Sequence, residues 1–377
     1  MLVGAAEDAA KAPTLAQAKV KMDLAKLAGF DAIRLTAGWG TGQTEPLSSD
    51  LAGLRNAVDA ADLDGIAVFL SVYPYGSSVT PITAQARSDF AAFAASLATA
   101  LPTVHRFIVG NEPNLNRFWM PQFTDGGGDA AALAYEAMLA QTYDALKAVS
   151  PAVTVIGGAL SPRGNDSILS KKHSPTTFIA DLGRAYRRSG RALPIMDAFS
   201  FHPYEDNSSV PPSFVHPRST TIALADYPKL VGLLGKAFGG TAQAGSTLPI
   251  VYDEFGVQSR IPATKARVYE GYKPSSERTV AEARQGAYYA QALALAACQP
   301  TVTSFLIFHV SDESQLDRWQ SGVFYADDTP KSSLPVVQHA VSALRAGKLA
   351  GCAAGTAATP VRASAKSKGV PPRRNHK

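Results

Sequence analysis

Short runs of apolar residues alternate with amphipathic segments eight times along the chain. The apolar runs are continuous rather than alternating, which is typical of parallel strands that are covered on both faces. They are residues 2–6, 32–35, 67–72, 106–110, 154–159, 198–202, 250–253 and 304–310. Helical periodicity lies between them; Val20, Leu24 and Leu27, for example, stand at i, i+4 and i+7. The pattern predicts an α/β protein, a (β/α)8 barrel (TIM barrel) in a single domain.

The length and the charge distribution refine this prediction. The chain has 377 residues, and such barrels have about 250 residues, or up to about 400 with insertions. We expect the catalytic barrel to cover residues 1–352, followed by a disordered basic tail over residues 353–377. The tail holds six cations and no acid, and without it the chain has 30 basic and 31 acidic residues. A basic face for nucleic acid is therefore not expected on the folded part.

Three connections are longer than the rest, at about residues 113–129, 160–174 and 203–221. Each follows a predicted strand, so each is a βα loop. Active sites of these barrels lie at the C-terminal ends of the strands and are built from the βα loops. The long loops therefore indicate a substrate site on that side.

Two glutamates stand at the ends of predicted strands. Glu112 ends the fourth strand in FIVGNEPN, and Glu254 ends the seventh in PIVYDEFG. Hydrolysis of a glycoside with retention needs two carboxyl groups about 5–5.5 Å apart, one protonated and one ionised. The placement of this pair predicts that chemistry.

The motifs NEPNLNRFW, FSFHPY and YDEFG, in this order on a βα rhythm, resemble glycoside hydrolase clan A, and within it family 39 and the related cellulase-like hydrolases. The resemblance covers about residues 1–345. It implies that Glu112 is the acid/base and Glu254 the nucleophile. It further implies that Asn111 binds the 2-hydroxyl of the sugar, and that Arg34 lies beside Glu254 and keeps it ionised.

The resemblance also places His202 and Tyr204 at the sugar site. All three tryptophans fall in segments that follow predicted strands, so we expect Trp39, Trp119 and Trp319 to contact sugar. Many clan members carry a tryptophan on strand eight under the cleaved sugar, whereas this chain reads SFLIFHVSDES there. The platform is then Phe308, or Trp319, or neither.

We therefore expect a retaining glycoside hydrolase that cleaves a β-linked oligo- or polysaccharide. Two alternatives stay open. A sugar hydroxyl in place of water would make the same site a transglycosylase, and the altered eighth strand is compatible with a non-catalytic carbohydrate-binding barrel. No cofactor and no metal are expected, since strand one is not followed by a histidine pair and no HExxH motif occurs. We expect a monomer. We expect no membrane segment, because no apolar run approaches about 18 residues.

The two cysteines and the start of the chain concern the cellular compartment of the protein. Cys298 and Cys352 belong to no metal-ligand pattern; they either form a disulfide or remain two buried thiols. The start, MLVGAAED, reads as a strand rather than a signal peptide. The resemblance to extracellular polysaccharide-degrading enzymes predicts secretion, with the cytoplasm as the alternative.

Overall fold

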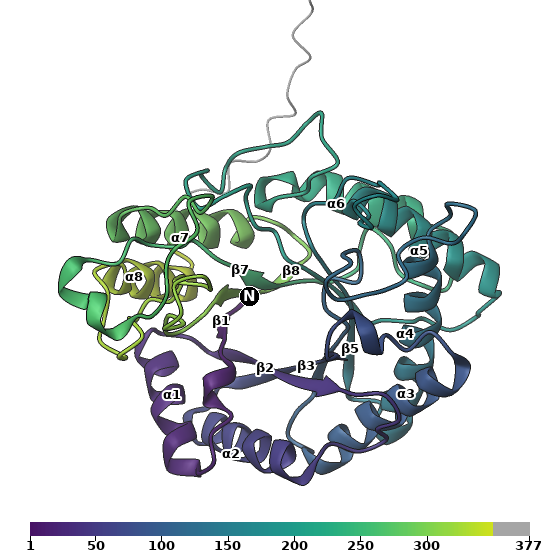
Figure 1. Ribbon diagram of the computed structural model, residues 1–377, viewed down its shortest axis with the longest axis horizontal. Coiled ribbons are helices and arrows are strands. Elements are labelled where there is room, and N and C mark those ends of the chain that lie inside the picture. The colour runs from purple at the N-terminus through teal and green to yellow at the C-terminus, as the bar shows by residue number, and fades with distance from the viewer. Residues whose placement is uncertain (350–377) are drawn as a thin grey trace, which may run out of the picture.

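The computed structural model describes residues 1–349, in which eight parallel strands close into a barrel inside a ring of helices (Figure 1). The strands are β1 (Leu2–Ala6), β2 (Ala32–Trp39), β3 (Ala67–Pro74), β4 (Arg106–Val109), β5 (Thr154–Leu160), β6 (Ala198–Phe201), β7 (Ile250–Phe255) and β8 (Val302–Phe308). Each pairs with the next, and β8 closes on β1 in a register that runs from Leu2 opposite Ser304 to Ala6 opposite Phe308. The predicted (β/α)8 barrel is confirmed.

One helix follows each strand and covers the outside of the barrel (Figure 1). The helices are α1 (Leu15–Leu27), α2 (Ser48–Asp64), α3 (Ala84–Ala100), α4 (Ala130–Val149), α5 (Pro175–Ser189), α6 (Tyr227–Phe238), α7 (Glu282–Ala297) and α8 (Leu334–Arg345). Four of them begin after a side chain that accepts a hydrogen bond from a backbone N–H near the helix start, which satisfies a donor that the helix leaves unpaired. These capping residues are Thr14, Thr83, Asp129 and Ser174.

The interior of the barrel changes from apolar to polar along the strands. Near their N-terminal ends, one small buried cluster includes Ala32, Phe69, Ala198 and Val251. Two residues further along the same strands stand four buried polar side chains, Arg34, Ser71, Ser200 and Asp253. Residues two apart on a strand share a face. The strands therefore carry a polar layer directly above an apolar one, at the end where barrel active sites lie.

The βα loops on this side are long. The three predicted ones occupy residues 110–129, 161–174 and 202–223. Two further long connections, residues 256–281 and 309–333, follow β7 and β8 and were not predicted. They form a 3-10 turn at Ala263–Val268 and several isolated bridges, one of which joins Glu270 to Gln315. Five of the βα loops at the mouth of the barrel are therefore long, rather than the three that the sequence predicted.

Some expectations fall outside the described residues. The predicted tail at residues 353–377 is one, and Cys352 is another, so its pairing with Cys298, which follows α7, stays a prediction. Across residues 1–349, no helix is both long enough and apolar enough to span a bilayer.

Candidate active site

Glu112 and Glu254 meet at the C-terminal mouth of the barrel. Glu254 lies in β7, and Glu112 follows β4 with a backbone φ of 40°. That conformation is uncommon for a residue with a side chain, and a hydrogen bond of 2.7 Å from the Glu112 N–H to the Ala159 carbonyl helps to hold it. Both carboxyl groups remain partly open, with 15% and 12% of their side-chain surfaces exposed.

His202, directly after β6, connects the two carboxyl groups. Its Nδ1 lies 3.1 Å from Oε1 of Glu112 and 3.5 Å from Oε2 of Glu254. The two oxygens are therefore no further apart than the sum of these distances. This limit places both carboxyl groups within reach of one sugar; it lies above the about 5–5.5 Å typical of retaining glycosidases and at the start of the about 6.5–9.5 Å range of inverting ones. The ring of His202 is fully buried, so it holds the carboxyl groups of Glu112 and Glu254 at this spacing from the interior of the barrel.

Arg34, buried in β2, joins the nucleophile candidate to the polar layer. Its Nη1 donates to Oε1 of Glu254, and its Nη2 donates to Ser71 Oγ and to Asn111 Oδ1, both at 3.1 Å. Its Nε lies 3.2 Å from Asp253 Oδ2. The fork of the guanidinium thus contacts Ser71 on β3, Asn111 just after β4, and β7, and it fixes Glu254 in one orientation.

Arg34, His202 and Asp253 are three buried charged side chains in this layer. Burial by itself lowers the pKa of His202, but the charges of Glu254 and Asp253 outweigh it and raise that pKa to about 10. Burial likewise opposes ionisation of Asp253, yet His202 and Arg34 hold its pKa below the ordinary value. The imidazolium and the guanidinium therefore face ionised Asp253, and their remaining charge is directed at the two glutamates.

Tyr204 holds the other oxygen of Glu254. Its hydroxyl donates to Oε2 of Glu254 at 3.0 Å. Burial, together with the charges of Glu254 and Glu112, raises the pKa of Tyr204 well above its ordinary value. The phenol therefore stays protonated and remains a donor. With Arg34 on Oε1 and Tyr204 on Oε2, both oxygens of Glu254 are oriented.

An aromatic wall continues from Tyr204. The ring of Trp319 lies 5.1 Å from that of Tyr204 and 5.4 Å from that of Phe308. Trp319 also lies over Gly256, where a Cβ atom would come within 3.1 Å of the indole. Phe308 and Trp319 are both partly exposed. Of the alternatives for the platform, Phe308 and Trp319 are thus both present beside the site.

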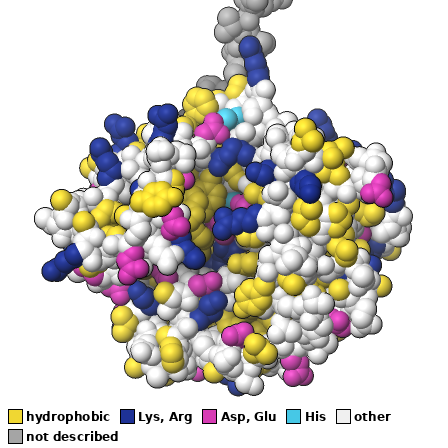
Figure 2. Space-filling model, in the orientation of Figure 1, with side chains coloured by type: hydrophobic (Ala, Val, Ile, Leu, Met, Phe, Trp, Pro, Cys, Tyr) yellow, Lys and Arg dark blue, Asp and Glu magenta, His cyan; other side chains and the backbone are white. Residues whose placement is uncertain are grey.

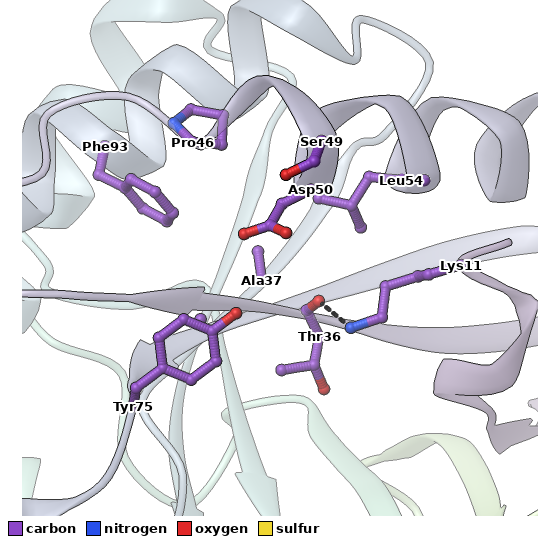
Figure 3. A pocket seen from close by; sticks show the side chains of 11 residues that line it. Lys11, Thr36, Ala37, Pro46, Ser49, Asp50, Leu54, Tyr75 and Phe93 are labelled. Carbon is purple, nitrogen blue, oxygen red and sulfur yellow. Dashed lines mark hydrogen bonds between the residues drawn. The ribbon is translucent and has the colours of Figure 1, made fainter. Parts of the chain in front are cut away.

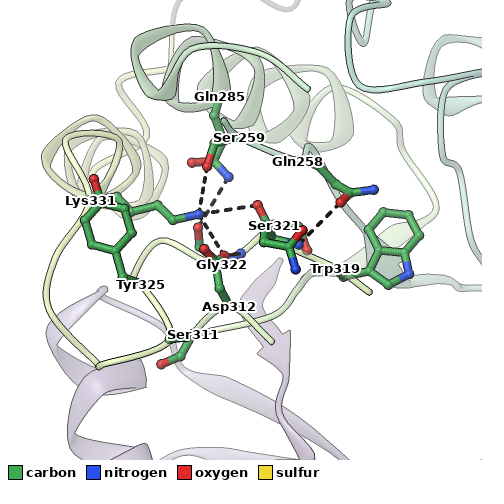
Figure 4. Close-up of polar contacts among 12 residues, drawn as sticks. Gln258, Ser259, Gln285, Ser311, Asp312, Trp319, Ser321, Gly322, Tyr325 and Lys331 are labelled. Atoms are coloured by element: carbon green, nitrogen blue, oxygen red, sulfur yellow. Dashed lines mark hydrogen bonds and ion pairs between the residues drawn. The ribbon is translucent and has the colours of Figure 1, made fainter. Parts of the chain in front are cut away.

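Trp319 is held by a buried polar network that links the two unpredicted loops (Figure 4). Lys331 donates to Ser259 Oγ at 2.8 Å and to Asp312 Oδ1 at 2.7 Å, and its side chain and that of Asp312 are fully buried. The backbone N–H of Trp319 donates to Glu313 Oε2 at 3.0 Å. Ser259 belongs to the β7–α7 loop and the others to the β8–α8 loop, so the network fixes one loop against the other.

Two of the expected sugar contacts are corrected by the structure. Trp39 is the last residue of β2 and fully buried, with its ring against Phe90 at 5.7 Å. Trp119 is 1% exposed and packs edge-on against Tyr135, also at 5.7 Å. Both follow or end a strand, as the sequence indicated, but their rings turn away from the mouth and pack between barrel and helices.

Asp253 and Ser71 belong to the site but were not predicted from the sequence. Their signal was present in the spacing, since each stands two residues after an apolar interior residue of its strand. Among residues 1–349, no group of three or more His, Cys, Asp or Glu side chains is arranged to hold a metal ion.

A separate cavity of about 190 Å³ lies between the ends of β2 and β3 and helix α2 (Figure 3). Lys11, Asp50 and Tyr75 line it, and Lys11 donates to the carbonyl of Thr36 at 2.7 Å. None of the expected site residues lines this cavity, so it is distinct from the pair of glutamates.

No protein-family model matches the chain, and no curated protein does. Solved structures are similar to it in fold. A GH39 enzyme from Xanthomonas axonopodis pv. citri is 15% identical over 90% of this chain and 65% of its own, with a TM-score of 0.56. A GH39 β-xylosidase from Caulobacter crescentus is 18% identical over 90% and 70%, with a TM-score of 0.54. A glucosidase from Croceicoccus marinus is 13% identical over 91% and 66%, with a TM-score of 0.59.

The chain spans 65% of the length of the Xanthomonas enzyme. The fold expected from the resemblance to clan A, and to family 39 in particular, is the fold that these glycoside hydrolases have.

Proposed function

We propose that this protein is a retaining glycoside hydrolase that cleaves a β-linked oligo- or polysaccharide, with Glu254 as nucleophile and Glu112 as general acid/base. The observation that carries the proposal is the position of His202 Nδ1 between the two carboxyl groups, 3.1 Å from one and 3.5 Å from the other. Carboxyl groups this close can both reach one anomeric centre, and the two donors on Glu254 favour its use as the nucleophile of a retaining mechanism. The similar structures include a β-xylosidase and a glucosidase.

The environment of Glu254 suits attack on the anomeric carbon. Arg34 and Tyr204 donate to its two oxygens, which stabilises the carboxylate and aims it. In the first step, an oxygen of Glu254 forms a bond to the anomeric carbon while the bond to the leaving oxygen breaks. The product is a glycosyl-enzyme ester.

The carboxyl group of Glu112 has fewer donors, since within residues 1–349 it forms one hydrogen bond, with Nδ1 of His202. In the first step it gives its proton to the departing oxygen. In the second step it takes a proton from water, whose oxygen displaces Glu254 and restores the free enzyme. Asn111, fixed by Arg34 through its Oδ1, has its amide N–H groups left to donate to the sugar 2-hydroxyl. If a sugar hydroxyl replaces water, the same site transfers the glycosyl group.

The roles of the two glutamates can be tested with an aryl glycoside whose leaving group departs without protonation. In Glu112→Ala, the glycosyl-enzyme still forms but lacks a base for its hydrolysis. Azide needs no base, so it should restore turnover and give a glycosyl azide of retained configuration. In Glu254→Ala, azide can attack only from the vacated side and should give the inverted product. General acid–base help is worth about 10²–10⁴-fold, which is measurable.

Glu270→Gln is the matched control, because Glu270 is exposed in the β7–α7 loop. Its activity should equal that of the wild type. Inverted product from Glu112→Ala and retained product from Glu254→Ala would mean that the roles are exchanged. A wild type that binds oligosaccharides but cleaves no glycoside in a broad panel would identify a non-catalytic carbohydrate-binding barrel instead.

A further inference from the structure

We propose that the leaving-group side of this cleft binds an anionic saccharide, with Arg163 as the residue that pairs with a carboxylate or sulfate beside the cleaved bond. This inference rests on the proposed function, and it names the substrate class that the site selects. Arg163 lies in the β5–α5 loop, and sequence analysis did not select it. It carries the proposal because it is anchored next to the catalytic residues and is still open to solvent.

The anchoring of Arg163 is specific. Its Nη1 donates to the carbonyl of Tyr204 at 3.1 Å and to that of Glu205 at 2.8 Å. The hydroxyl of Tyr204 orients Glu254. Arg163 therefore contacts the backbone of a residue that itself contacts the proposed nucleophile. The side chain of Arg163 is 41% exposed. One nitrogen is thus fixed by the backbone, while the rest of the fork remains available to a planar anion.

The acids around Arg163 leave much of its charge unpaired. Its nearest carboxylate is that of Asp206, 3.8 Å away and half-exposed. Burial, with the charges of Asp226 and Asp206, raises the pKa of neighbouring Glu205 to about 8, so Glu205 is neutral at pH 7. An anion on a bound sugar would therefore meet a cation that is held in place but only loosely paired.

Three more cations lie on the same side. Arg117, Lys171 and Lys172 are exposed, and within the described part of the chain none of them has an ion-pair partner. A bridge between Leu115 and Lys172 joins the β4–α4 loop to the β5–α5 loop. The same pair of loops therefore presents all three cations together with Arg163.

The acids of these two loops do not neutralise the cations. Asp129 caps α4 by accepting from the N–H of Ala132 at 2.7 Å, and Asp166 accepts from the N–H of Ser174 at 2.7 Å. Asp125 lies in the exposed glycine-rich turn that Thr124 and Gly128 close. Apart from Glu112 itself, the loops hold no other acid.

The position of the cations tells which part of the substrate they meet. Glu112 must reach the departing oxygen, so the leaving saccharide lies against the loops that follow β4 and β5. The opposite side of the site carries Trp319 and Phe308. Figure 2 shows this asymmetry, with hydrophobic side chains on one wall of the central hollow and Lys or Arg side chains on the other.

Binding of defined polymers to the full-length protein tests the proposal. The probes are β-1,4-linked polymannuronate as the uronate, cellulose sulfate as the sulfate ester and hydroxyethyl cellulose as the neutral β-linked control. Binding is measured in the Glu112→Gln background, so that it does not depend on turnover. We expect one anionic polymer to bind more tightly than hydroxyethyl cellulose, and Arg163→Gln to weaken the binding of that polymer about tenfold, as for the loss of a charge-assisted contact. Arg163→Lys, which keeps the charge without the fork, should weaken it less.

The basic tail is the matched control. Replacement of its cations, Arg362, Lys366, Lys368, Arg373, Arg374 and Lys377, by Gln leaves Arg163 intact. This variant should bind the anionic polymer as the Glu112→Gln parent does. The proposal is overturned if the tail variant loses binding of the anionic polymer and Arg163→Gln does not. It is also overturned if hydroxyethyl cellulose binds as tightly as the anionic polymers, or if duplex DNA binds as tightly and depends on Arg163.

The two anionic polymers distinguish carboxylate from sulfate as the recognised group. Failure of this inference is also distinct from failure of the proposed function. If Arg163→Gln changes no binding but the azide products form as expected, the hydrolase stands and the anionic substrate class falls. If Arg163 governs binding but neither glutamate affects activity, the saccharide site stands without the catalytic assignment.

Discussion

Nε2 of His202 lies 3.3 Å from Oδ1 of Asp253, and both side chains are fully buried. Ser200 donates to the same carboxylate oxygen, and Arg34 lies against the other. Glu254 and Asp253 are thereby the counter-ions that keep a proton on the ring between the two carboxyl groups proposed to be catalytic. The charge of His202, rather than its shape alone, is then part of the site.

The first prediction follows for Asp253→Asn. The pKa of His202, raised to about 10 in the wild type, should fall toward its ordinary value of about 6.5 once the carboxylate is gone. A raised histidine pKa means that the protonated form is favoured up to that pKa, so the variant should lose the imidazolium at a lower pH. The measurement is a ¹⁵N NMR titration of the imidazole, assigned by its absence in His202→Gln. An unchanged titration would show that Glu254 and Glu112 suffice to hold the proton.

The second prediction contrasts two tryptophans. Trp319→Ala should raise KM about tenfold, since aromatic contacts are worth about 0.5–1.5 kcal/mol, and it should change the free energy of unfolding little because the ring is partly exposed. Trp119→Ala should lower the free energy of unfolding by about 3–5 kcal/mol, as is usual for a fully buried tryptophan. Steady-state kinetics and urea denaturation measure both. Equal loss of stability in the two variants would contradict the assigned positions.

A third prediction concerns the buried pair Lys331 and Asp312. Lys331→Met alone leaves the Asp312 carboxylate buried without its cation, and should cost about 3–5 kcal/mol of unfolding free energy. The double variant Lys331→Met with Asp312→Leu removes both charges, so it should be much closer to the wild type. Chemical denaturation of the two variants gives the comparison. A double variant as unstable as the single one would show that the surrounding hydrogen bonds, and not the lone charge, dominate.

The fourth prediction is a pH dependence. Glu205 is 7% exposed, both of its carboxylate oxygens lack a hydrogen-bond partner, and burial raises its pKa to about 8. The folded protein therefore holds a proton that the unfolded chain releases above its own pKa near 4.5. The advantage of the neutral form is complete below about pH 4.5 and is lost as the pH rises through about 8.

Glu205→Gln, which is neutral at every pH, should therefore gain stability relative to the wild type as the pH rises across this window. Denaturation curves at several pH values between 4.5 and 8.5 measure the difference. The matched substitution Glu270→Gln, at an exposed site, should show no such trend. A constant difference between Glu205→Gln and the wild type would mean that the carboxyl group is ionised in the folded state.

Much of the architecture follows from local patterns. Continuous apolar runs place all eight strands, because parallel strands buried on both faces need no alternation. The strand ends also bring Glu112 and Glu254 to one mouth. Arg34, His202 and Tyr204 were expected beside them from the resemblance, and they contact the pair.

The rest depends on contacts between distant segments. Whether a tryptophan near a strand end faces the mouth or the helices depends on its neighbours. Trp39 packs against Phe90 and Trp119 packs against Tyr135, and both rings are buried. The loops after β7 and β8 are ordered by side-chain contacts such as that of Lys331 with Ser259, 72 positions away. No local period encodes such pairs, so those loops were missed.

The closure of β8 onto β1 has a consequence for dividing the chain. Glu112 and Arg34 belong to the first four strands, whereas His202, Asp253 and Glu254 belong to the last four. A fragment that holds either half therefore lacks one of the two proposed catalytic carboxyl groups and leaves unpaired charges on its inner face. Separately expressed halves should each be inactive, and any activity that returns on mixing would report the re-formation of both seams, β4 with β5 and β8 with β1. If the two glutamates act as proposed, enzymatic activity therefore measures the reassembly of the two halves.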